Sequence, residues 1–448
     1  MILLGCRVPT WPLSTVILSV RRIVDTLFIP HLETIRLAKN TWTDSIIILS
    51  QAQHGRGAVR NSSSIAPIRV AVIGLASGDR TSWASNAHLP YLLSPRGRER
   101  YRIVALCNSS IDAAERAIKA YELPSETKAY GDPSELARDE SVDLVVCSTR
   151  VDVHYKTILP SIYAGKDIYL EWPLAHDIDR SRELVEAARH SGSRTVVGIQ
   201  GRVAPVHEKI RETLRKGVVG KVLSTEFRVV DGPATRDSLP LELKYFAQSA
   251  VGGNIYTIYF AHFWDQVQHV LGEVDQLSSR FQIQRPQVSI FDAASHDVVE
   301  KVISDVPDLI TVSGSISANS DFAIPGATVS GRFRLGRPFP GEPRLVWSVV
   351  GEKGELRLTA GSSLLQAMGH DDPVVIEIHD FESDQVETIE WEWNEWQEDL
   401  PIVARSVGVL YEKFASGEAV PTFEDAIRRH EQLEILKFLA DYKSQQQA

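Results

Sequence analysis

From residue 68 to residue 200, short runs of β-branched and other apolar residues alternate with helix-like segments. Parallel βαβ units produce this alternation, because each strand is followed by a helix that crosses back over the sheet. The runs at 68–74 and 142–149 are almost continuously apolar, as strands covered by helices on both faces are. The sequence therefore predicts an α/β domain with a doubly wound parallel sheet. Its expected strands are 68–74, 101–107, 142–149, 167–171 and 195–200.

The pattern changes after residue 200. A strand-rich region follows, in which residues 329–335 alternate apolar and polar side chains. This alternation indicates an open sheet with one face in water. Helices are expected both before and after the strands, so this half of the chain is predicted to be an α+β domain. The expected helices are 207–216, 254–271, 403–415 and 424–443, and the expected strands are 222–230, 276–282, 309–317, 327–335, 345–350 and 355–359.

Length and composition limit the class of protein. A chain of 448 residues, 43% of them apolar, is longer than one core usually supports, so two packed domains are expected. The three cysteines, Cys6, Cys107 and Cys147, form no CxxC pair, which argues against zinc and for a reducing, cytoplasmic location. The formal charge of −10 disfavours direct nucleic-acid binding. No apolar run reaches the roughly 18 residues of a membrane-spanning helix, so no membrane association is expected.

Residues 1–66 differ in charge from the rest of the chain. They carry seven Arg or Lys against three acids, so their net charge is +4 and that of the remainder is −14. An Arg-rich leader is typical of a mitochondrial transit peptide, but the acids and the prolines weaken that interpretation. We prefer a poorly ordered extension, or a start codon placed too far upstream, that ends in the serine-rich linker 61–64.

A glycine-containing turn, Gly74 to Gly78, ends the first strand. Such a turn lets the backbone approach a pyrophosphate, and the helix that follows offers free N–H groups. Ala76 takes the place of the second glycine of a GxGxxG motif, and a purely structural turn remains the alternative. The second strand ends at Asn108 and Ser109 without an acid, so NADP fits this tip at least as well as NAD. Helix capping is the alternative role for the serine.

Four later segments carry a resemblance to a known family: HYKTILPSIYAGKDIYLEWPLA (154–175), VGIQGR (197–202), LRKGVVGKVLSTEF (214–227) and GGNIYTIYFAHFWD (252–265). In this order they resemble the glucose-fructose oxidoreductase and inositol dehydrogenase family, Gfo/Idh/MocA. The resemblance implies a Rossmann domain that binds NAD or NADP, a C-terminal domain with an open, mostly antiparallel sheet, a substrate cleft between the two, and a homodimer. The expected organisation is therefore an extension (1–66), a dinucleotide-binding domain (67–200) and a substrate and dimerisation domain (201–448).

Two positions depart from the family pattern. Glu171-Trp172-Pro173 stands where the family commonly has Glu-Lys-Pro, so Trp172 replaces a lysine that assists proton movement, which an indole cannot do. Ile258 falls on the place of an aspartate, while His262 keeps the place of the family's histidine. A helical spacing of four puts Ile258 and His262 on the same face, which we expect to line the cleft. His262 is then the remaining candidate for proton transfer, and packing or ligand binding is its alternative role.

The combination is most similar to a fungal subgroup, the galactose-regulon repressor and its relatives, some of which are treated as oxidoreductases of secondary metabolism. Two hypotheses follow. The first is an NAD(P)-dependent oxidoreductase acting on a small hydroxylated or carbonyl compound; the second is a catalytically silent, cofactor-sensing regulator that binds a transcription activator and can be nuclear. For the first, the expected cofactor residues are Gly74, Ala76, Gly78, Asn108, Ser109, Glu171 and Trp172, the catalytic residue is His262, the substrate residues are Tyr256, Tyr259 and Arg202, and no metal site is expected.

Overall fold

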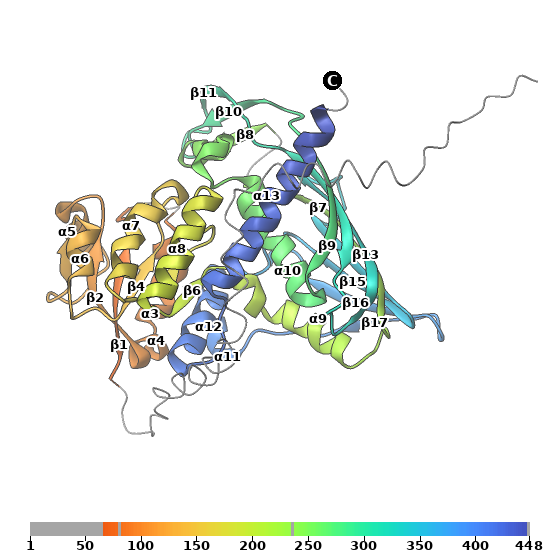
Figure 1. Cartoon of the computed structure of the whole chain (residues 1–448), viewed down its shortest axis with the longest axis horizontal. Coiled ribbons are helices and arrows are strands. Elements are labelled where there is room, and N and C mark those ends of the chain that lie inside the picture. Colours follow the sequence, from red (N-terminus) through yellow and green to blue (C-terminus); the bar gives the residue numbers. More distant parts are fainter. Residues whose placement is uncertain (1–65, 79–81, 234–236, 446–448) are drawn as a thin grey trace, which may run out of the picture. The chain divides into compact units, whose positions relative to one another are not determined.

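The computed structural model describes residues 66–78, 82–233 and 237–445. The interpretation of residues 1–66 lies outside the described residues, apart from Ala66. From Ala66 onwards the chain forms one compact unit, in which two large β-sheets are joined by helices (Figure 1). None of the helices in the described ranges is both long and apolar enough to cross a bilayer.

The first sheet has six parallel strands in the order β3-β2-β1-β4-β5-β6. Successive residues of β1 point to opposite faces, so that Val70 and Val72 belong to one buried cluster while Ala71 and Ile73 belong to another. Both faces are therefore covered, which confirms the predicted doubly wound α/β fold. The strands are β1 Ile68–Ile73, β2 Tyr101–Cys107, β3 Lys128–Tyr130, β4 Leu144–Cys147, β5 Asp167–Leu170 and β6 Thr195–Val197.

The helices between these strands cover the two faces of the first sheet. Side chains of α6, α7 and α8 join the buried cluster of Ala71, whereas side chains of α3 and α5 join that of Val70. Gly192, with a φ of 72°, ends α8 in the left-handed conformation that glycine adopts easily. The helical segments of this half are η1 Ala84–His88, α3 Leu89–Leu93, α4 Pro95–Arg100, α5 Ile111–Ala120, α6 Pro133–Ala137, α7 Val151–Tyr163 and α8 Ile178–Ser191.

The second sheet has eight strands in the order β17-β16-β15-β14-β7-β13-β12-β9. Only the pair β7 and β13 is parallel, so the sheet is mostly antiparallel, as predicted. One face is dry, because Phe263 of α10 packs against Phe227 of β7 and Trp347 of β14. The strands are β7 Val222–Asp231, β9 Val274–Gln282, β12 Leu309–Ile316, β13 Ala323–Leu335, β14 Leu345–Gly351, β15 Gly354–Ala360, β16 Val375–Asp380 and β17 Gln385–Ile389.

The sequence did not predict several strands. β3 is an edge strand of the first sheet, β16 and β17 form one edge of the second sheet, and a small third sheet pairs β10 with both β11 and β8. These strands are short or rich in exposed charges; in β11, for example, every side chain is at least partly exposed. β11 and β17 have no buried face and so carry no apolar alternation to detect, whereas β10 and β16 do alternate but are only five and six residues long. The third sheet consists of β8 Ser238–Pro240, β10 Gln287–Phe291 and β11 Val298–Ile303.

The last two long helices return to the first sheet. α12 packs against α3 and η1, and its Tyr411 joins the buried cluster of Val70. α13 lies against α8 and β9 and so touches both halves of the unit (Figure 1). The boundary at residue 200 stays a prediction, and α12 lies on the side of the first sheet. The remaining helical segments are η2 Gln200–Val203, α9 Pro205–Arg215, η3 Leu241–Ala247, η4 Ser249–Val251, η5 Ile255–Phe260, α10 Ala261–Leu271, α11 Glu395–Glu398, α12 Ile402–Ser416 and α13 Phe423–Gln445.

Candidate functional site

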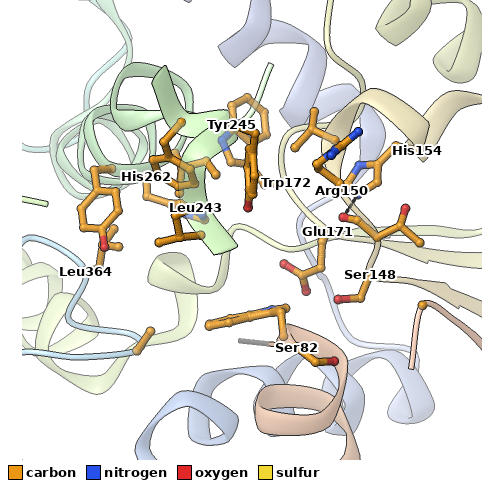
Figure 2. A pocket seen from close by; sticks show the side chains of 18 of the residues that line it. Ser82, Ser148, Arg150, His154, Glu171, Trp172, Leu243, Tyr245, His262 and Leu364 are labelled. Carbon is orange, nitrogen blue, oxygen red and sulfur yellow. Dashed lines mark hydrogen bonds between the residues drawn. The ribbon is translucent and has the colours of Figure 1, made fainter. Parts of the chain in front are cut away.

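A cavity of about 500 Å³ lies at the carboxyl ends of the first sheet. Gly74, Ser148 and Glu171, each close behind the end of β1, β4 or β5, form one end of it. The other end is formed by η3, by the helical segment η5–α10 and by residues 364–368. Figure 2 shows Trp172 between these two groups, with His262 and Leu364 on one side and Glu171 and Ser148 on the other. Ligands of parallel α/β sheets bind at this edge.

The glycine turn after β1 requires a residue without a side chain. Gly74 has a φ of +95°, and a Cβ atom there would lie 2.5 Å from the carbonyl oxygen of Ser148. Gly74 and Ala76 line the cavity, whereas Gly78 is not part of its wall. Trp83, which follows the turn, also lines the cavity, and its buried indole N–H has no acceptor within the described part of the chain. The backbone at the turn and this free donor fit a phosphate-bearing cofactor.

The tip of β2 supports the turn. The Asn108 side-chain amide donates to the carbonyl oxygen of Leu75 at 2.8 Å, and the hydroxyl of Tyr121 donates to that of Ala76 at 2.7 Å. Ser109 is exposed, and Ser110 rather than Ser109 caps α5. Neither Asn108 nor Ser109 lines the cavity. The structure therefore gives Asn108 a bracing role for the turn and leaves the tip uncharged.

Glu171 is the centre of a buried polar cluster that the sequence did not reveal. Its carboxylate accepts from Nε2 of His88 at 2.9 Å and from Nε2 of Gln200 at 2.9 Å. Nδ1 of His88 is hydrogen-bonded to the hydroxyl of Tyr411, 2.8 Å away. His88 is fully buried and lies 83 residues from Glu171 in sequence, so no local pattern connects the two. The cluster fixes the carboxyl group of Glu171 at the cavity wall.

Trp172 forms a wall between the two ends of the cavity. Its indole N–H donates to the carbonyl oxygen of Thr257 at 2.7 Å, and its ring centroid lies 4.5 Å from that of His430. Its one polar hydrogen is therefore not available to a ligand. The geometry agrees with the expectation that this residue cannot move protons.

His262 lies on the first turn of α10, at the end of the cavity that η3, η5–α10 and residues 364–368 form. Ile258 lines the cavity as well, as the spacing of four predicts. The imidazole has no hydrogen-bond partner among the residues described. Burial lowers the pKa of His262 from its ordinary 6.5 to about 4, and the charges of Glu171 and Asp265 offset this only in part. At neutral pH the imidazole is therefore uncharged and can accept a proton.

The three expected substrate residues lie in different places. Tyr259 lines the cavity close to His262 in sequence, and burial raises the pKa of its hydroxyl. Tyr256 instead faces the core, where its hydroxyl donates to the carbonyl oxygen of Leu433. Arg202 is held by Asp265 at 2.7 Å and by Asp425 at 3.0 Å. Neither Tyr256 nor Arg202 belongs to the cavity wall, so the structure does not bring them to the candidate site.

Gln366 is a cavity residue that the sequence did not indicate. It is buried in the loop after β15, and its side-chain oxygen accepts from Nε2 of Gln266 at 2.8 Å. Its side-chain N–H group has no acceptor in the described ranges, and the residue lines the cavity. A loop glutamine carries no periodic signal, so the sequence pattern does not indicate Gln366.

Comparisons with known proteins agree with this arrangement. Residues 68–199 match a family model described as "Oxidoreductase family, NAD-binding Rossmann fold", and residues 205–360 match one described as "Gal80p, C-terminal domain". The chain is 30% identical over 378 residues to dehydrogenase aclE of Aspergillus oryzae, which covers 82% of this chain and 95% of the relative. It is 25% identical over 311 residues to the galactose/lactose metabolism regulatory protein GAL80 of Saccharomyces cerevisiae, covering 68% and 69%.

Solved structures share the fold. A super-repressor mutant of Gal80p from Saccharomyces cerevisiae superposes with a TM-score of 0.74 at 20% identity, covering 84% of this chain and 97% of that one. Levoglucosan dehydrogenase in complex with NADH and L-sorbose superposes with a TM-score of 0.64 at 17% identity, covering 84% of this chain and 98% of that one. At these identities the likeness shows the fold alone. On the sequence comparisons, the chain belongs to the Gfo/Idh/MocA oxidoreductase family, and its C-terminal part is of the Gal80p type.

Proposed function

We propose that this chain is an NAD(P)-dependent oxidoreductase that acts on a small hydroxylated or carbonyl compound. The single observation that carries the proposal is the free, uncharged imidazole of His262 in a cavity at the carboxyl ends of the parallel strands. Membership of an oxidoreductase family and the dehydrogenase relative support it.

The cofactor would bind at the carboxyl ends of the first sheet. The turn with Gly74, Ala76 and Gly78 would hold the phosphates through its backbone. Asn108 and Ser109 would face the ribose, with no carboxylate to oppose a 2′-phosphate. Glu171 and Trp172 would border the nicotinamide. When bound, NAD(P) supplies the carbon that accepts or donates hydride.

His262 exchanges the proton of the reacting oxygen. In the direction of oxidation, the imidazole of His262 would take the hydroxyl proton of the alcohol, and bound NAD(P)⁺ would supply the hydride acceptor that balances the formation of the carbonyl compound. The lowered pKa of His262 keeps it in the accepting form at neutral pH. Tyr259, with its hydroxyl in the same cavity, is placed to hold the substrate oxygen.

The test combines cofactor binding with turnover. Purified full-length protein is titrated with NADPH and NADH by calorimetry and assayed by nicotinamide absorbance with a panel of alcohols and carbonyl compounds. His262→Asn should lower kcat/KM about 10²- to 10⁴-fold while the cofactor Kd stays within about twofold.

His269→Asn is the matched control, because His269 lies two turns further along α10 and outside this cavity. It should keep full activity. If neither nucleotide produces heat, or if His262→Asn is as active as the wild type, the proposal is wrong.

A second candidate function has its own support. The indole N–H of Trp172 is bound to a backbone carbonyl, so the place of the family's lysine carries no acid or base. This feature and the likeness to GAL80 favour a cofactor-binding regulator without catalysis that acts on a transcription activator. The same assay discriminates between the two: the regulator binds NAD(P)H but turns over no member of the panel, and affinity capture recovers an activator.

We also propose that the chain forms a homodimer through the open face of the second sheet. That face carries Leu223, which is 40% exposed, and Arg357. Light scattering after size-exclusion chromatography should give twice the mass of 49.8 kDa. Leu223→Arg should shift the protein towards the monomer, and a wild-type monomer at micromolar concentration would contradict the proposal.

A further inference from the structure

The end of the cavity that is formed by η3, by η5–α10 and by residues 364–368 is mostly apolar. The rings of Trp172 and Tyr245 stand at its sides, and hydrocarbon side chains make up most of the remaining wall. Glu242 is the carboxylate from this half of the chain, and it is exposed, which places it at the mouth. The apolar lining consists of Leu243, Phe246, Ile258, Leu364, Ala367 and Met368.

Most polar groups of the wall are already occupied by the protein itself. The indole N–H of Trp172 is bound to Thr257, and the carboxylate of Glu171 accepts from His88 and from Gln200. Arg150 donates twice to Asp152, at 2.7 Å each. These groups cannot serve a substrate without giving up their present partners.

Apart from the exposed carboxylate of Glu242 at the mouth, three polar side-chain groups remain for a ligand at this end. They are the imidazole of His262, the hydroxyl of Tyr259 and the amide N–H group of Gln366. None of the three groups has a hydrogen-bond partner within 66–78, 82–233 and 237–445. Three groups of this kind can satisfy one oxygen function fully, or two in part.

From this count we propose that the substrate is a small, largely apolar ring compound with one or two oxygen functions, an alicyclic or aromatic alcohol or ketone, and not a polyol. The inference rests on the proposed oxidoreductase function and names its substrate class. The reacting oxygen lies against His262 and Tyr259, a second oxygen lies against Gln366, and the ring lies among Leu243, Ile258 and Leu364.

Two physical effects disfavour the binding of a polyol: the loss of hydrogen bonds and the limited volume of the cavity. Each hydroxyl that leaves water without finding a partner loses its hydrogen bonds, and this end of the cavity offers too few partners for five or six hydroxyls. The cavity of about 500 Å³ also has to hold the nicotinamide half of the cofactor, so only a small ring fits beside it.

The experiment compares two ligands that share one carbon ring. Cyclohexanol carries one hydroxyl and myo-inositol carries six, so the pair isolates the number of hydroxyls. Each is tested with the full chain saturated with NAD⁺ or NADP⁺, by turnover and, separately, by calorimetric binding. We expect kcat/KM for cyclohexanol to exceed that for myo-inositol by at least about 100-fold. Cyclohexanol should also bind more tightly than myo-inositol.

Failure of the inference and failure of the proposed function give different results. Turnover of myo-inositol as fast as of cyclohexanol overturns the substrate class and leaves the oxidoreductase function standing. Selective binding of cyclohexanol without turnover of any panel compound supports the apolar site and contradicts the oxidoreductase function. Binding of neither ring by the cofactor-saturated protein overturns the inference.

A variant tests the wall directly. Ile258→Asn places an amide among the apolar side chains and should weaken cyclohexanol about tenfold while cofactor affinity is kept. Ile303→Asn is the matched control, because Ile303 is 72% exposed on β11 and does not line the cavity. Equal affinities for cyclohexanol in both variants and the wild type would place the ring elsewhere and overturn the inference.

Discussion

Trp172 stands where the family resemblance implies a lysine. It keeps the wall of the cavity intact, yet it offers no proton and no free donor. Trp172→Phe should therefore lower kcat by less than about tenfold and cost about 1 kcal/mol of unfolding free energy, the worth of the lost bond to Thr257. Steady-state kinetics and urea unfolding measure the two effects. A loss of kcat of a hundredfold or more at unchanged stability would mean that the indole takes part in the chemistry.

The protonation of His262 predicts the shape of the pH profile. Burial lowers its pKa to about 4, so the accepting form persists through the range in which an ordinary histidine becomes charged. The value of kcat/KM for alcohol oxidation should show no inflection near pH 6.5 and should begin to fall only as the pH approaches 4. A full titration curve centred near 6.5, lost in His262→Asn, would contradict this assignment.

At the residue scale the sequence placed some of the site and missed the rest. Ile258 and His262 share a helical face, and periodicity is enough to predict that. Tyr256 lies two residues before Ile258, which on a helix is the opposite face, so it points into the core. His88 and Gln366 could not be found, because their neighbours in space come from distant parts of the chain.

At the scale of an element, the turn after β1 offers two glycines with similar backbone angles. Gly74 has a φ of +95° and Gly78 a φ of +81°, but a Cβ atom would clash only at Gly74. Gly74→Ala should destabilise the protein by about 2 kcal/mol or more and weaken NAD(P) binding, whereas Gly78→Ala should cost about 1 kcal/mol. Thermal unfolding and calorimetry compare the pair. Equal effects would show that the close approach to Ser148 is not what the turn requires.

The helix pair α10 and α13 is tied by buried charges. Arg429, fully buried on α13, contacts Asp265 of α10 at 3.1 Å and Glu273 at 3.2 Å. Arg429→Met leaves Asp265 without one of its partners and should lower the unfolding free energy by about 3 to 5 kcal/mol. The neighbouring exposed Arg428, replaced by Met, should cost less than about 1 kcal/mol. Equal urea midpoints for the two variants would contradict the role of the buried pair.

These buried charges also explain why Arg202, which the sequence suggested as a substrate residue, does not line the cavity. Arg202 follows the fifth predicted strand, a position that favours ligand contact, but Asp265 and Asp425 hold its guanidinium away from the cavity. Five of the six strands of the first sheet were predictable because their side chains are largely buried, whereas the edge strand β3, which is three residues long and has no buried residue, was not. Edge strands such as β17, exposed and charged, were not.

At the scale of the whole molecule, several buried histidines make the fold sensitive to acid. Burial lowers the pKa of His207 and of His262 to about 4, and that of His430 to about 3. Between pH 6.5 and these values the unfolded chain binds protons that the native chain does not, so stability falls as the pH falls. Each histidine contributes at most about 1.4 kcal/mol per pH unit.

Urea unfolding between pH 7.5 and 4.5 measures this slope. His207→Asn is a suitable variant, because Nδ1 of His207 donates to the carbonyl oxygen of Gly201, a bond that the asparagine amide can replace, while Nε2 has no partner within the described chain. The variant should flatten the slope by about one proton. A slope equal to that of the wild type would show that His207 does not titrate differently in the two states.

The return of α12 to the first sheet has a consequence for protein engineering. Tyr411 of this helix is hydrogen-bonded to His88 and packs among the side chains beneath β1, so the half with the first sheet is completed by residues from near the end of the chain. A chimera that exchanges only the segment up to residue 200 between relatives would lose the native packing of α12 against the helices of the first sheet. A successful graft has to carry residues 402–416 with it, and a circular permutation that begins just before α12 would make the module contiguous.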